Sequence, residues 1–484
     1  MPDGDTIYIN GINGETGEYL LPPMGVEDMA AIAIGEPKNT AKNNWLAAIW
    51  HKIKTPFMGL PLGVDPADVT QAGWGIVFLK DEDAAVKAAL QPLIEHRKKQ
   101  IHNDAIVKIL DYTPGEKYEA WLGRNGVSPG STIPSKVPYY LLLVGDPAQI
   151  SFEFGHLLDV EYGVGWLHFD TPAEYATYAA SVIDYETSSS VPNGKEAVFF
   201  GTRHPFDQAT KMSADYLVNP LADGISAAGS DPATPGVAQQ WGYQTKKIGG
   251  NDATKANLID ALCQPADRKP PAFLFTASHG MGFPSGSPAQ KASQGALLCQ
   301  DWPGFGTISP NHYFSAADVP AGARIQGMVI FHFACYGGGT PDHDQFVHDP
   351  GQPPAQIAAS PFLAALPKTW LTHPGGGALA VIGHVERAWG YSIIGAASTG
   401  PQIQTFQNAI GRTLIGQPLG YALKDFSERY AALSTSLSAL LQQKEWGQKV
   451  DPDDLVTNWI ERNDAEGYIL IGDPAVKLRA NDLA

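Results

Sequence analysis

The 484-residue chain contains only three cysteines, Cys263, Cys299 and Cys335. They are too few and too widely spaced for a disulfide framework or for paired CxxC metal ligands. An odd number leaves at least one free thiol, and the usual place for a free thiol is the hydrophobic core. Each cysteine therefore has to be interpreted from the residues beside it.

The chain also lacks long apolar runs and an excess of positive charge. It has no stretch of about 18 apolar residues, and residues 1–10 show no basic start followed by an apolar segment, so neither a transmembrane helix nor a secretory signal is expected. The 33 basic and 50 acidic residues give a net charge of −17, which disfavours nucleic acids and anionic membranes as partners. These absences predict a cytoplasmic protein that binds neither nucleic acids nor anionic membranes.

Short apolar segments ending in small residues recur along the chain and alternate with helical patterns. With 44% hydrophobic residues, 51 glycines and 38 prolines, the composition is that of a loop-rich globular protein. The apolar segments are residues 75–80, 139–146, 197–202, 272–278, 327–334, 378–383 and 467–472, and helical stretches include 83–101, 171–186, 207–217, 252–263, 361–371 and 404–447. This alternation predicts a three-layer αβα sandwich with a mostly parallel sheet. We expect an irregular lead-in over 1–70, a smaller α/β subdomain over 71–135 and a main domain over 136–484.

Two of the expected strands end in a reactive side chain next to glycine. The segment FLFTASHGMG places His279 before Gly280, and VIFHFACYGGG places Cys335 shortly before three glycines. Carboxyl ends of parallel strands meet at one sheet edge, a thiolate is a strong nucleophile, and an imidazole can move its proton near neutral pH. Alone, either residue could be structural. Together they predict a Cys–His dyad, with glycine N–H groups free to bind an oxyanion.

At these residues the chain resembles the gingipain-like family of clan CD cysteine peptidases, a clan that also includes caspases and clostripain. The shared features are the strand ending in His-Gly, the strand ending in Ala-Cys, and four further segments in the same order. These segments are YYLLLVGDPAQI (139–150), LLDVEYG (157–163), GGALAVIGHVERAW (376–389) and EGYILIGDPAVKLR (466–479). The likeness spans about residues 75–480.

The resemblance implies a caspase-like catalytic domain that cleaves peptide bonds through a thioester acyl-enzyme and requires no cofactor for this chemistry. It assigns the catalytic roles to Cys335 and His279, and the oxyanion hole to the backbone N–H groups of Gly280 and Cys335. Glu153 is a candidate for the acid that orients His279, because gingipains keep a glutamate in the corresponding loop.

The resemblance also implies a substrate preference. Asp159 takes the place of the carboxylate at the bottom of the S1 pocket in the arginine- and lysine-specific gingipains, and Trp389 takes the place of an aromatic residue lining that pocket. A buried carboxylate needs a cationic partner, so we expect cleavage after Arg, with Lys second. The alternatives are an ordinary loop or capping role for Asp159 and core packing for Trp389.

The chain departs from the family pattern beside both catalytic residues. Ala277-Ser278 stands before His279 in place of Thr-Gly, so Ser278 becomes a candidate S1 residue. Phe333 is bulkier than the small aliphatic residue expected beside S1, which predicts a narrower pocket. His332 could be a second base, but alternation along a strand favours its pointing to the other face.

The loop after Cys335 contains several acidic residues and histidines. Asp342, Asp344 and His348 are weak candidate ligands for a structural Ca²⁺ or for Zn²⁺, although their spacing matches no established metal-binding loop. A solvated active-site loop is the competing interpretation.

The main hypothesis is therefore an intracellular, regulated cysteine endopeptidase whose substrates are proteins or peptides with Arg or Lys before the cleaved bond. Two alternatives stay open: a catalytically silent interaction module that kept the fold, and an effector peptidase that is active only after binding a protein partner or after processing.

Overall fold

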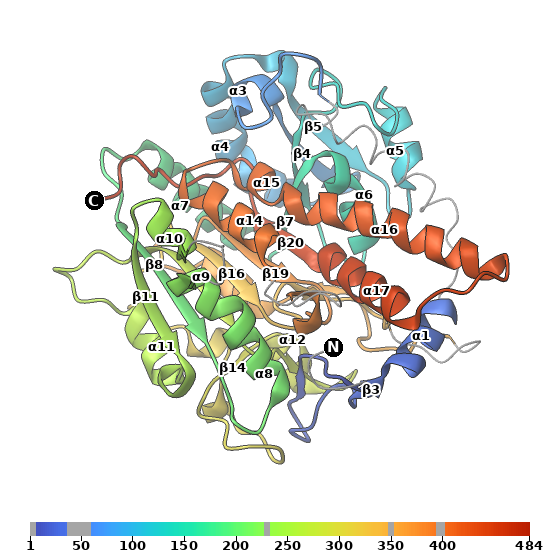
Figure 1. Ribbon diagram of the computed structural model, residues 1–484. Coiled ribbons are helices and arrows are strands. Elements are labelled where there is room, and N and C mark those ends of the chain that lie inside the picture. The colour runs from blue at the N-terminus through green and yellow to red at the C-terminus, as the bar shows by residue number, and fades with distance from the viewer. Residues whose placement is uncertain (1–5, 36–59, 227–232, 347–352, 394–401) are drawn as a thin grey trace.

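The molecule is built around one ten-stranded sheet, seen in the computed structural model of Figure 1. The structure describes residues 6–35, 60–226, 233–346, 353–393 and 402–484. Across the sheet the strands are β11 (Gln244–Gly249), β8 (Gly194–Gly201), β12 (Pro271–Ala277), β16 (Val329–Phe333), β19 (Ala380–His384), β20 (Tyr468–Gly472), β7 (Gly163–Leu167), β6 (Tyr140–Val144), β4 (Trp74–Leu79) and β5 (Val107–Tyr112).

The sheet consists of two parallel halves that run in opposite directions. Strands β11, β8, β12, β16 and β19 are parallel to one another, and β20, β7, β6, β4 and β5 are parallel to one another. The two halves meet at the antiparallel pair β19 and β20. The mostly parallel sheet predicted from the sequence is confirmed, and the carboxyl ends of β6 and β12 point to opposite edges.

Helices cover both faces of this sheet. They are α1 (Val26–Gly35), α3 (Val69–Ala72), α4 (Ala84–Ile101), α5 (Tyr118–Arg124), α6 (Phe152–Glu161), α7 (Pro172–Thr187), α8 (Gln208–Ser213), α9 (Asn219–Asp223), α10 (Val237–Gln240), α11 (Lys255–Leu262), α12 (Pro288–Ser293), α13 (Ala365–Leu371), α14 (Gln404–Leu414), α15 (Leu419–Ala422), α16 (Lys424–Glu445) and α17 (Pro452–Gly467). In Figure 1, α14 and α16 lie in front of the sheet.

Alternation along β16 shows how the three layers pack. Phe331 contacts Phe406 of α14 and Phe426 of α16, with ring centroids 5.8 and 6.0 Å apart. The next residue, His332, faces Trp370 of α13 on the opposite side of the sheet. Both faces of this strand are therefore buried, which is why its sequence reads as an unbroken apolar run. The αβα sandwich predicted from the sequence is confirmed.

Local signals explain where several helices begin and end. Asp83 caps α4 by accepting from the N–H of Ala85, and Thr171 with Glu174 forms a capping box at the start of α7. The single helix expected over 404–447 is instead divided into α14, α15 and α16. Gly416, with a φ of 80°, ends α14, and the N–H of Gln417 donates back to the carbonyl oxygen of Arg412. Pro418 then stands at the N-cap of α15.

A buried ion network joins the first and last parts of the chain. Arg97 of α4 lies 2.8 Å from Asp473, which follows β20, and 2.6 Å from Glu186 of α7. Trp74 of β4 donates its indole N–H to the same Asp473 at 2.9 Å. The Gly-Asp-Pro turn at 472–474 thus has a structural role here.

Four short two-stranded pairs surround the catalytic edge of the sheet and the N-terminus. These are β1 (Thr6–Ile7) with β3 (Met24–Gly25), β2 (Ile12–Asn13) with β13 (Met281–Gly282), β14 (Leu297–Leu298) with β15 (Tyr313–Phe314), and β17 (Gly339–Thr340) with β18 (Phe362–Leu363). A further pair joins β9 (Gly224–Ile225) and β10 (Thr234–Pro235). Strand β2 therefore ties the N-terminal segment to residues that follow His279.

The predicted boundary between residues 71–135 and 136–484 stays a prediction, because strands from both ranges share the central sheet. Among the residues described, we find no helix with the length and apolar character needed to cross a bilayer.

Candidate active site

Neighbouring strands bring His279 and Cys335 to the same edge of the sheet. β12 and β16 are paired in parallel with Ala277 opposite Phe333, and each reactive residue follows two residues after that pair. Gly280 lies directly against the nucleophile, since a Cβ atom on Gly280 would come within 1.8 Å of the carbonyl oxygen of Cys335. Only glycine fits this close approach.

The nucleophile lies in a buried and strained loop. The thiol of Cys335 donates to the carbonyl oxygen of Ala388 at 3.8 Å, and burial raises the pKa of this thiol to about 12. The next residue, Tyr336, has a φ of 58°, and its N–H donates to the carbonyl oxygen of Glu386, whose φ is 71°. Non-glycine residues rarely adopt this left-handed conformation, and such strain is concentrated at functional sites.

Asp207 orients the imidazole of His279. Its Oδ2 lies 2.9 Å from Nε2 of His279, and both side chains are fully buried. Burial opposes the ionisation of Asp207, but His279 and hydrogen bonds from Thr210 and Tyr19 outweigh that effect and hold its pKa well below the usual range. The carboxylate is therefore ionised at neutral pH and fixes the ring.

The other ring nitrogen of His279 faces the cleft. Its Nδ1 accepts the backbone N–H of Gly11 at 2.8 Å, so in this arrangement Nδ1 carries no proton and Nε2–H donates to Asp207. A Cβ placed on Gly11 would lie 3.2 Å from Sγ of Cys335. Because the backbone of Gly11 lies next to both side chains, the imidazole of His279 and the thiol of Cys335 face the same side of the site.

The sequence prediction named Glu153, and not Asp207, as the orienting acid, and the structure corrects it. Glu153 is exposed in the first turn of α6, which follows β6 in the half of the sheet that runs in the opposite direction. Asp207 follows β8, the strand beside β12, and caps α8 by accepting the N–H of Thr210. The position of Asp207 after a strand that neighbours β12 was the available signal, and Asp207 was not singled out from the sequence.

The structure places Asp159 in a packed contact between helices. Its carboxylate accepts the N–H of Val164 at 3.1 Å and the hydroxyl of Ser427 at 2.5 Å. The ammonium group of Lys424 donates to the backbone oxygen of Asp159 and to that of Tyr162. Burial raises the pKa of Asp159, and Lys424 opposes that effect. This carboxylate already has structural partners, so its assignment to the floor of S1 receives no geometric support.

The other predicted S1 residues differ in how near they come to the nucleophile. Trp389 adjoins Ala388, whose oxygen contacts Cys335, and its buried ring packs on Trp459 with centroids 5.6 Å apart. Phe333 packs on Phe406, and the hydroxyl of Ser278 donates to the carbonyl oxygen of His279. The ring of Trp389 is packed in a hydrophobic cluster, as in the core-packing alternative, and its place in an S1 pocket stays a prediction.

An ion cluster supports the loops beside Cys335. Arg387 donates to both carboxylate oxygens of Asp344, at 3.1 and 2.5 Å, and to Glu386 at 2.8 Å. All three side chains are buried, and burial raises the pKa of Glu386 well above its usual range. Asp344 therefore balances a guanidinium, which does not fit a Ca²⁺ ligand.

A metal site formed by the remaining candidates stays a prediction. Asp342 lies 3.1 Å from His343, while His348 falls outside the residues that the structure describes. Within the described ranges, no three His, Cys, Asp or Glu side chains form a group that could hold a metal ion.

His332 takes the structural role favoured from strand alternation. Its Nδ1 lies 2.7 Å from the hydroxyl of Thr276 on the neighbouring strand, and burial lowers the pKa of His332 to about 3. It stays neutral at physiological pH and faces α13, away from the contacts of Cys335.

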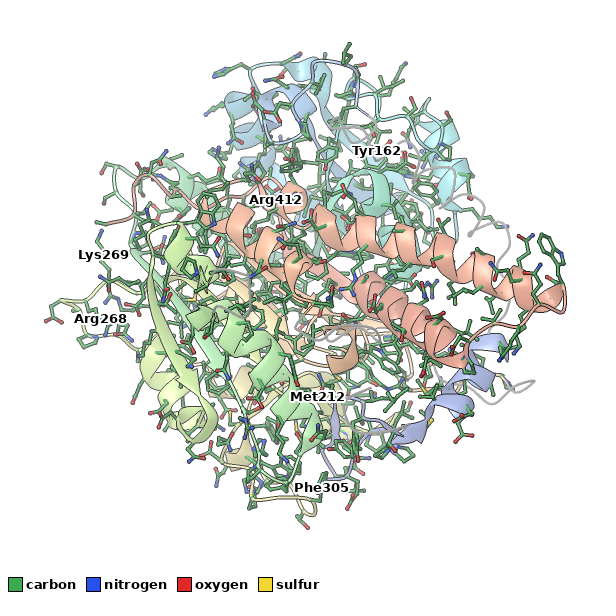
Figure 2. All side chains as sticks on the ribbon, in the orientation of Figure 1. Tyr162, Met212, Arg268, Lys269, Phe305 and Arg412 are labelled. Atoms are coloured by element: carbon green, nitrogen blue, oxygen red, sulfur yellow. The ribbon has the colours of Figure 1, made fainter. Side chains whose placement is uncertain are left out.

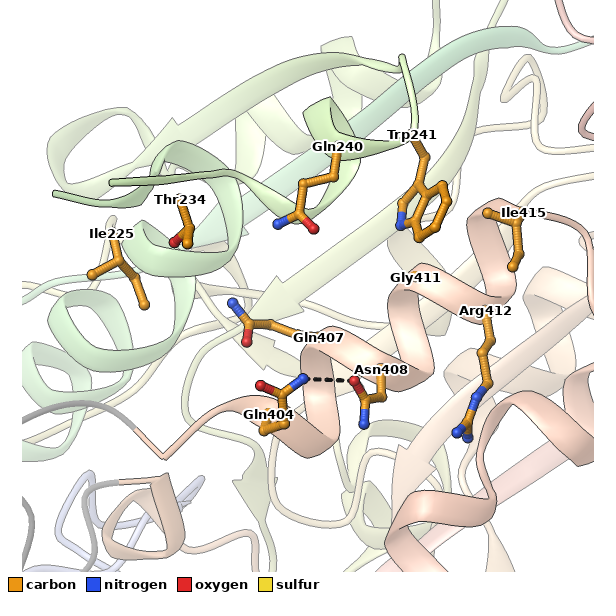
Figure 3. A pocket seen from close by; sticks show the side chains of 10 residues that line it. All are labelled: Ile225, Thr234, Gln240, Trp241, Gln404, Gln407, Asn408, Gly411, Arg412 and Ile415. Carbon is orange, nitrogen blue, oxygen red and sulfur yellow. Dashed lines mark hydrogen bonds between the residues drawn. The ribbon is translucent and has the colours of Figure 1, made fainter. Parts of the chain in front are cut away.

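A separate pocket of about 520 Å³ lies between α10 and α14 (Figure 3). Its lining is mainly polar and includes Trp241, Gln407 and Arg412. Gln404 donates to Asn408 at its edge. No residue of the predicted site lines this pocket, which therefore has no part in the chemistry of the dyad.

Comparison with known proteins identifies the family of the chain. A family model described as "Peptidase family C25" matches residues 76–479. No curated protein matches the chain. One similar solved structure, titled "Structure of Protease", is 14% identical, with a TM-score of 0.46 and coverage of 84% of this chain and 78% of that chain. Since the family model spans most of the sequence, the chain belongs to peptidase family C25, the gingipain family, and is a cysteine-type peptidase.

Proposed function

We propose that this protein is an endopeptidase in which Cys335 is the nucleophile, His279 the general base and acid, and Asp207 the positioning residue. The observation that carries the proposal is the imidazole of His279, which is held by Asp207 on one nitrogen and directs the other toward the space beside Cys335. This is the order of groups that activates a cysteine nucleophile.

The proposed reaction follows from these positions. Nδ1 of His279 takes the thiol proton, and Sγ of Cys335 attacks the carbonyl carbon of the substrate. We propose that the N–H groups of Gly280 and Cys335 bind the oxyanion, a role that the close packing of Gly280 against the backbone of Cys335 supports. The imidazolium then protonates the leaving amine, and water hydrolyses the thioester to release the second product.

The proposal includes a preference for Arg, and then Lys, at P1, the residue before the cleaved bond. Family membership supports it. Asp464 accepts the backbone N–H of Trp389 at 2.8 Å, and Trp389 follows Ala388, whose carbonyl oxygen contacts the thiol of Cys335. Asp464 and Glu386 act electrostatically on Cys335, and so does the oppositely charged Arg387. Because Asp464 contacts the backbone beside the nucleophile, we propose Asp464, and not Asp159, as the acid that favours a basic P1 side chain.

Peptides with Arg, Lys, Asp or Leu at P1 test this proposal. Hydrolysis would be measured under reducing conditions, with and without Ca²⁺, beside Cys335→Ala and Asp464→Asn variants. We expect Arg-selective turnover that disappears in Cys335→Ala, and a reduced preference for Arg over Leu in Asp464→Asn. Efficient cleavage only after Asp or Leu would remove the P1 assignment while keeping the dyad.

One observation favours the regulated form of this activity. Both His279 and Cys335 have no solvent exposure in this chain. An enzyme with a covered dyad needs a step that opens the site, such as binding of a protein partner or processing. The cytoplasmic location expected from the sequence stays a prediction, and cell fractionation tests it.

A further inference from the structure

The chain's own N-terminal segment fills the cleft between the two catalytic side chains. The N–H of Gly11 donates to Nδ1 of His279 at 2.8 Å, and a Cβ placed on Gly11 would lie 3.2 Å from Sγ of Cys335. In the linear sequence Gly11 is 268 residues away from His279. The full burial of His279 and Cys335 is therefore accompanied by direct contact with a distant piece of the same chain.

The contact of Gly11 with His279 suggests a register for comparing the segment with a substrate. The amide nitrogen that faces Nδ1 belongs to the bond between Asn10 and Gly11, and Nδ1 is the atom that has to protonate the nitrogen of a leaving amine. In a substrate-like register the nitrogen of Gly11 corresponds to the leaving amine and Asn10 corresponds to P1. Asn10 is buried, and its side-chain oxygen lies 3.9 Å from the position of a Cβ on Gly390, the residue after Trp389. The P1 position is thus beside the wall expected for S1.

On the other side of Gly11 the segment adds a strand to the site. Ile12 and Asn13 form β2, which pairs in parallel with Met281 and Gly282. The N–H of Ile12 donates to the carbonyl oxygen of Gly280 at 3.2 Å. Backbone pairing of this kind is a common way for a peptide to bind beside a sheet.

Further contacts anchor both ends of the segment. The hydroxyl of Tyr19 donates to Asp207, and its ring packs on Phe305 with centroids 5.1 Å apart. Figure 2 labels Phe305 at the lower end of the molecule. Upstream, Ile7 and Ile9 are buried in one cluster with Trp389 and α17, and Figure 1 shows α1 beside the end of α17.

We infer that residues 6–20, which we call the N-terminal plug, keep the full-length enzyme latent by binding in its cleft as a substrate would. The inference rests on the proposed function and identifies the element that controls it. The plug occupies the lone pair of Nδ1 that has to accept the thiol proton, and it seals Cys335 from water. Asn10 lacks the charge expected of a good P1 residue, so the plug is bound without being cut.

Gly11 provides a direct way to release the plug. Its φ is +109°, and a Cβ would lie 2.5 Å from Cδ1 of Leu20 and 3.2 Å from Sγ of Cys335. A Gly11→Ala change therefore disfavours the bound conformation twice, through the backbone and through the contacts. Gly63→Ala is a matched control, because Gly63 has a φ of +90° but no atom within 4 Å of the added Cβ.

The experiment compares the full-length wild type with both variants by two readouts. Alkylation of Cys335 by iodoacetamide, with the partly exposed Cys263 as internal reference, reports access to the thiol independently of catalysis. Turnover of an Arg peptide reports activity. We expect both rates to rise at least tenfold in Gly11→Ala and to stay at the wild-type level in Gly63→Ala.

The two readouts distinguish a failure of the plug hypothesis from a failure of the proposed peptidase function. If Gly11→Ala exposes Cys335 but cuts no peptide, the plug stands and the peptidase assignment fails. If the wild type cuts the peptide as fast as Gly11→Ala and its Cys335 is alkylated as fast as Cys263, the plug is refuted and the peptidase assignment stands.

An Asn10→Arg variant tests the register of the plug and does not depend on the folding of Gly11→Ala. It gives the plug the P1 residue that the enzyme is proposed to prefer. We expect cleavage that creates a new N-terminus at Gly11, seen by intact mass, and no cleavage when Cys335→Ala is combined with it. An enzyme that cuts Arg peptides but leaves this variant whole would overturn the substrate-like register.

Discussion

Replacing Asp207 by Asn should slow peptide cleavage by roughly 10- to 150-fold. The side chain of Asp207 sits 2.9 Å from Nε2 of His279 with no solvent exposure on either partner. Hydrogen bonds to charged groups contribute about 1.5–3 kcal/mol, and each 1.36 kcal/mol corresponds to a tenfold change in rate. An amide can also donate to Nε2, which would move the ring proton to Nδ1 and remove the base that the thiol of Cys335 needs.

The assay is kcat/KM as a function of pH with a fluorogenic peptide, in the same background for every variant, including Gly11→Ala if the wild type is silent. Asp215→Asn is the matched control, because Asp215 is a nearby acid in an exposed pair with Arg203. We expect the loss to fall mainly on kcat and the pH profile to change only in Asp207→Asn. A rate within threefold of the parent enzyme, or an equal loss in Asp215→Asn, would falsify the positioning role.

Other parts of the structure lead to further expectations. Arg97→Met should lower the free energy of unfolding, measured by urea titration, by about 3–5 kcal/mol, because it removes the guanidinium that pairs with the buried carboxylates of Asp473 and Glu186. Arg124 is exposed, so the control Arg124→Met should lower the free energy of unfolding by less than about 1 kcal/mol. Against the effect of burial, the ion pair with Arg97 helps to hold the pKa of Glu186 at about 2, below its usual 4.5, so the contribution of this carboxylate to the free energy of unfolding is complete above pH 4.5 and disappears as the pH falls through 2. The urea midpoint of unfolding should therefore decline between pH 4.5 and 2, and it should decline less in Glu186→Gln. Gly280→Ala should reduce kcat by about a hundredfold or more, because the added Cβ displaces the backbone of the oxyanion hole, and unchanged turnover would contradict that placement. Asp159→Asn should lower the melting temperature yet leave the ratio of Arg to Leu cleavage unchanged, and a lost Arg preference would restore Asp159 to the pocket.

The parts of the fold that could be predicted are the strands whose burial on both faces produces a continuous apolar run in the sequence. Strands β12, β16 and β19 are covered on both faces, so each is an unbroken apolar run in the sequence. Strand β11 is at the edge of the sheet and reads QTKKIG, and β7 contains two glycines, so neither has an apolar pattern that identifies it. Helix α17 contains many charged residues, and it too was not predicted.

The residues of the candidate site also fall into those that the sequence could identify and those that it could not. His279 and Cys335 could be found because each directly follows a recognisable strand and carries distinctive chemistry. Asp207 could not, since its partner is 72 residues away and its local pattern is that of a helix cap. Asp159 was misplaced because the motif around it continues into a helix whose contacts with Ser427 and Lys424 involve residues more than 260 positions away.

By itself, then, the sequence determined the class of fold and the candidates for nucleophile and base, because strand burial and reactive side chains are properties of short segments. Only the tertiary structure decided that the two halves of the sheet run in opposite directions, that Asp207 orients His279, and that Gly11 lies between the catalytic residues. These features depend on which distant segments meet, and the pairing of distant segments is set by the packing of the whole chain.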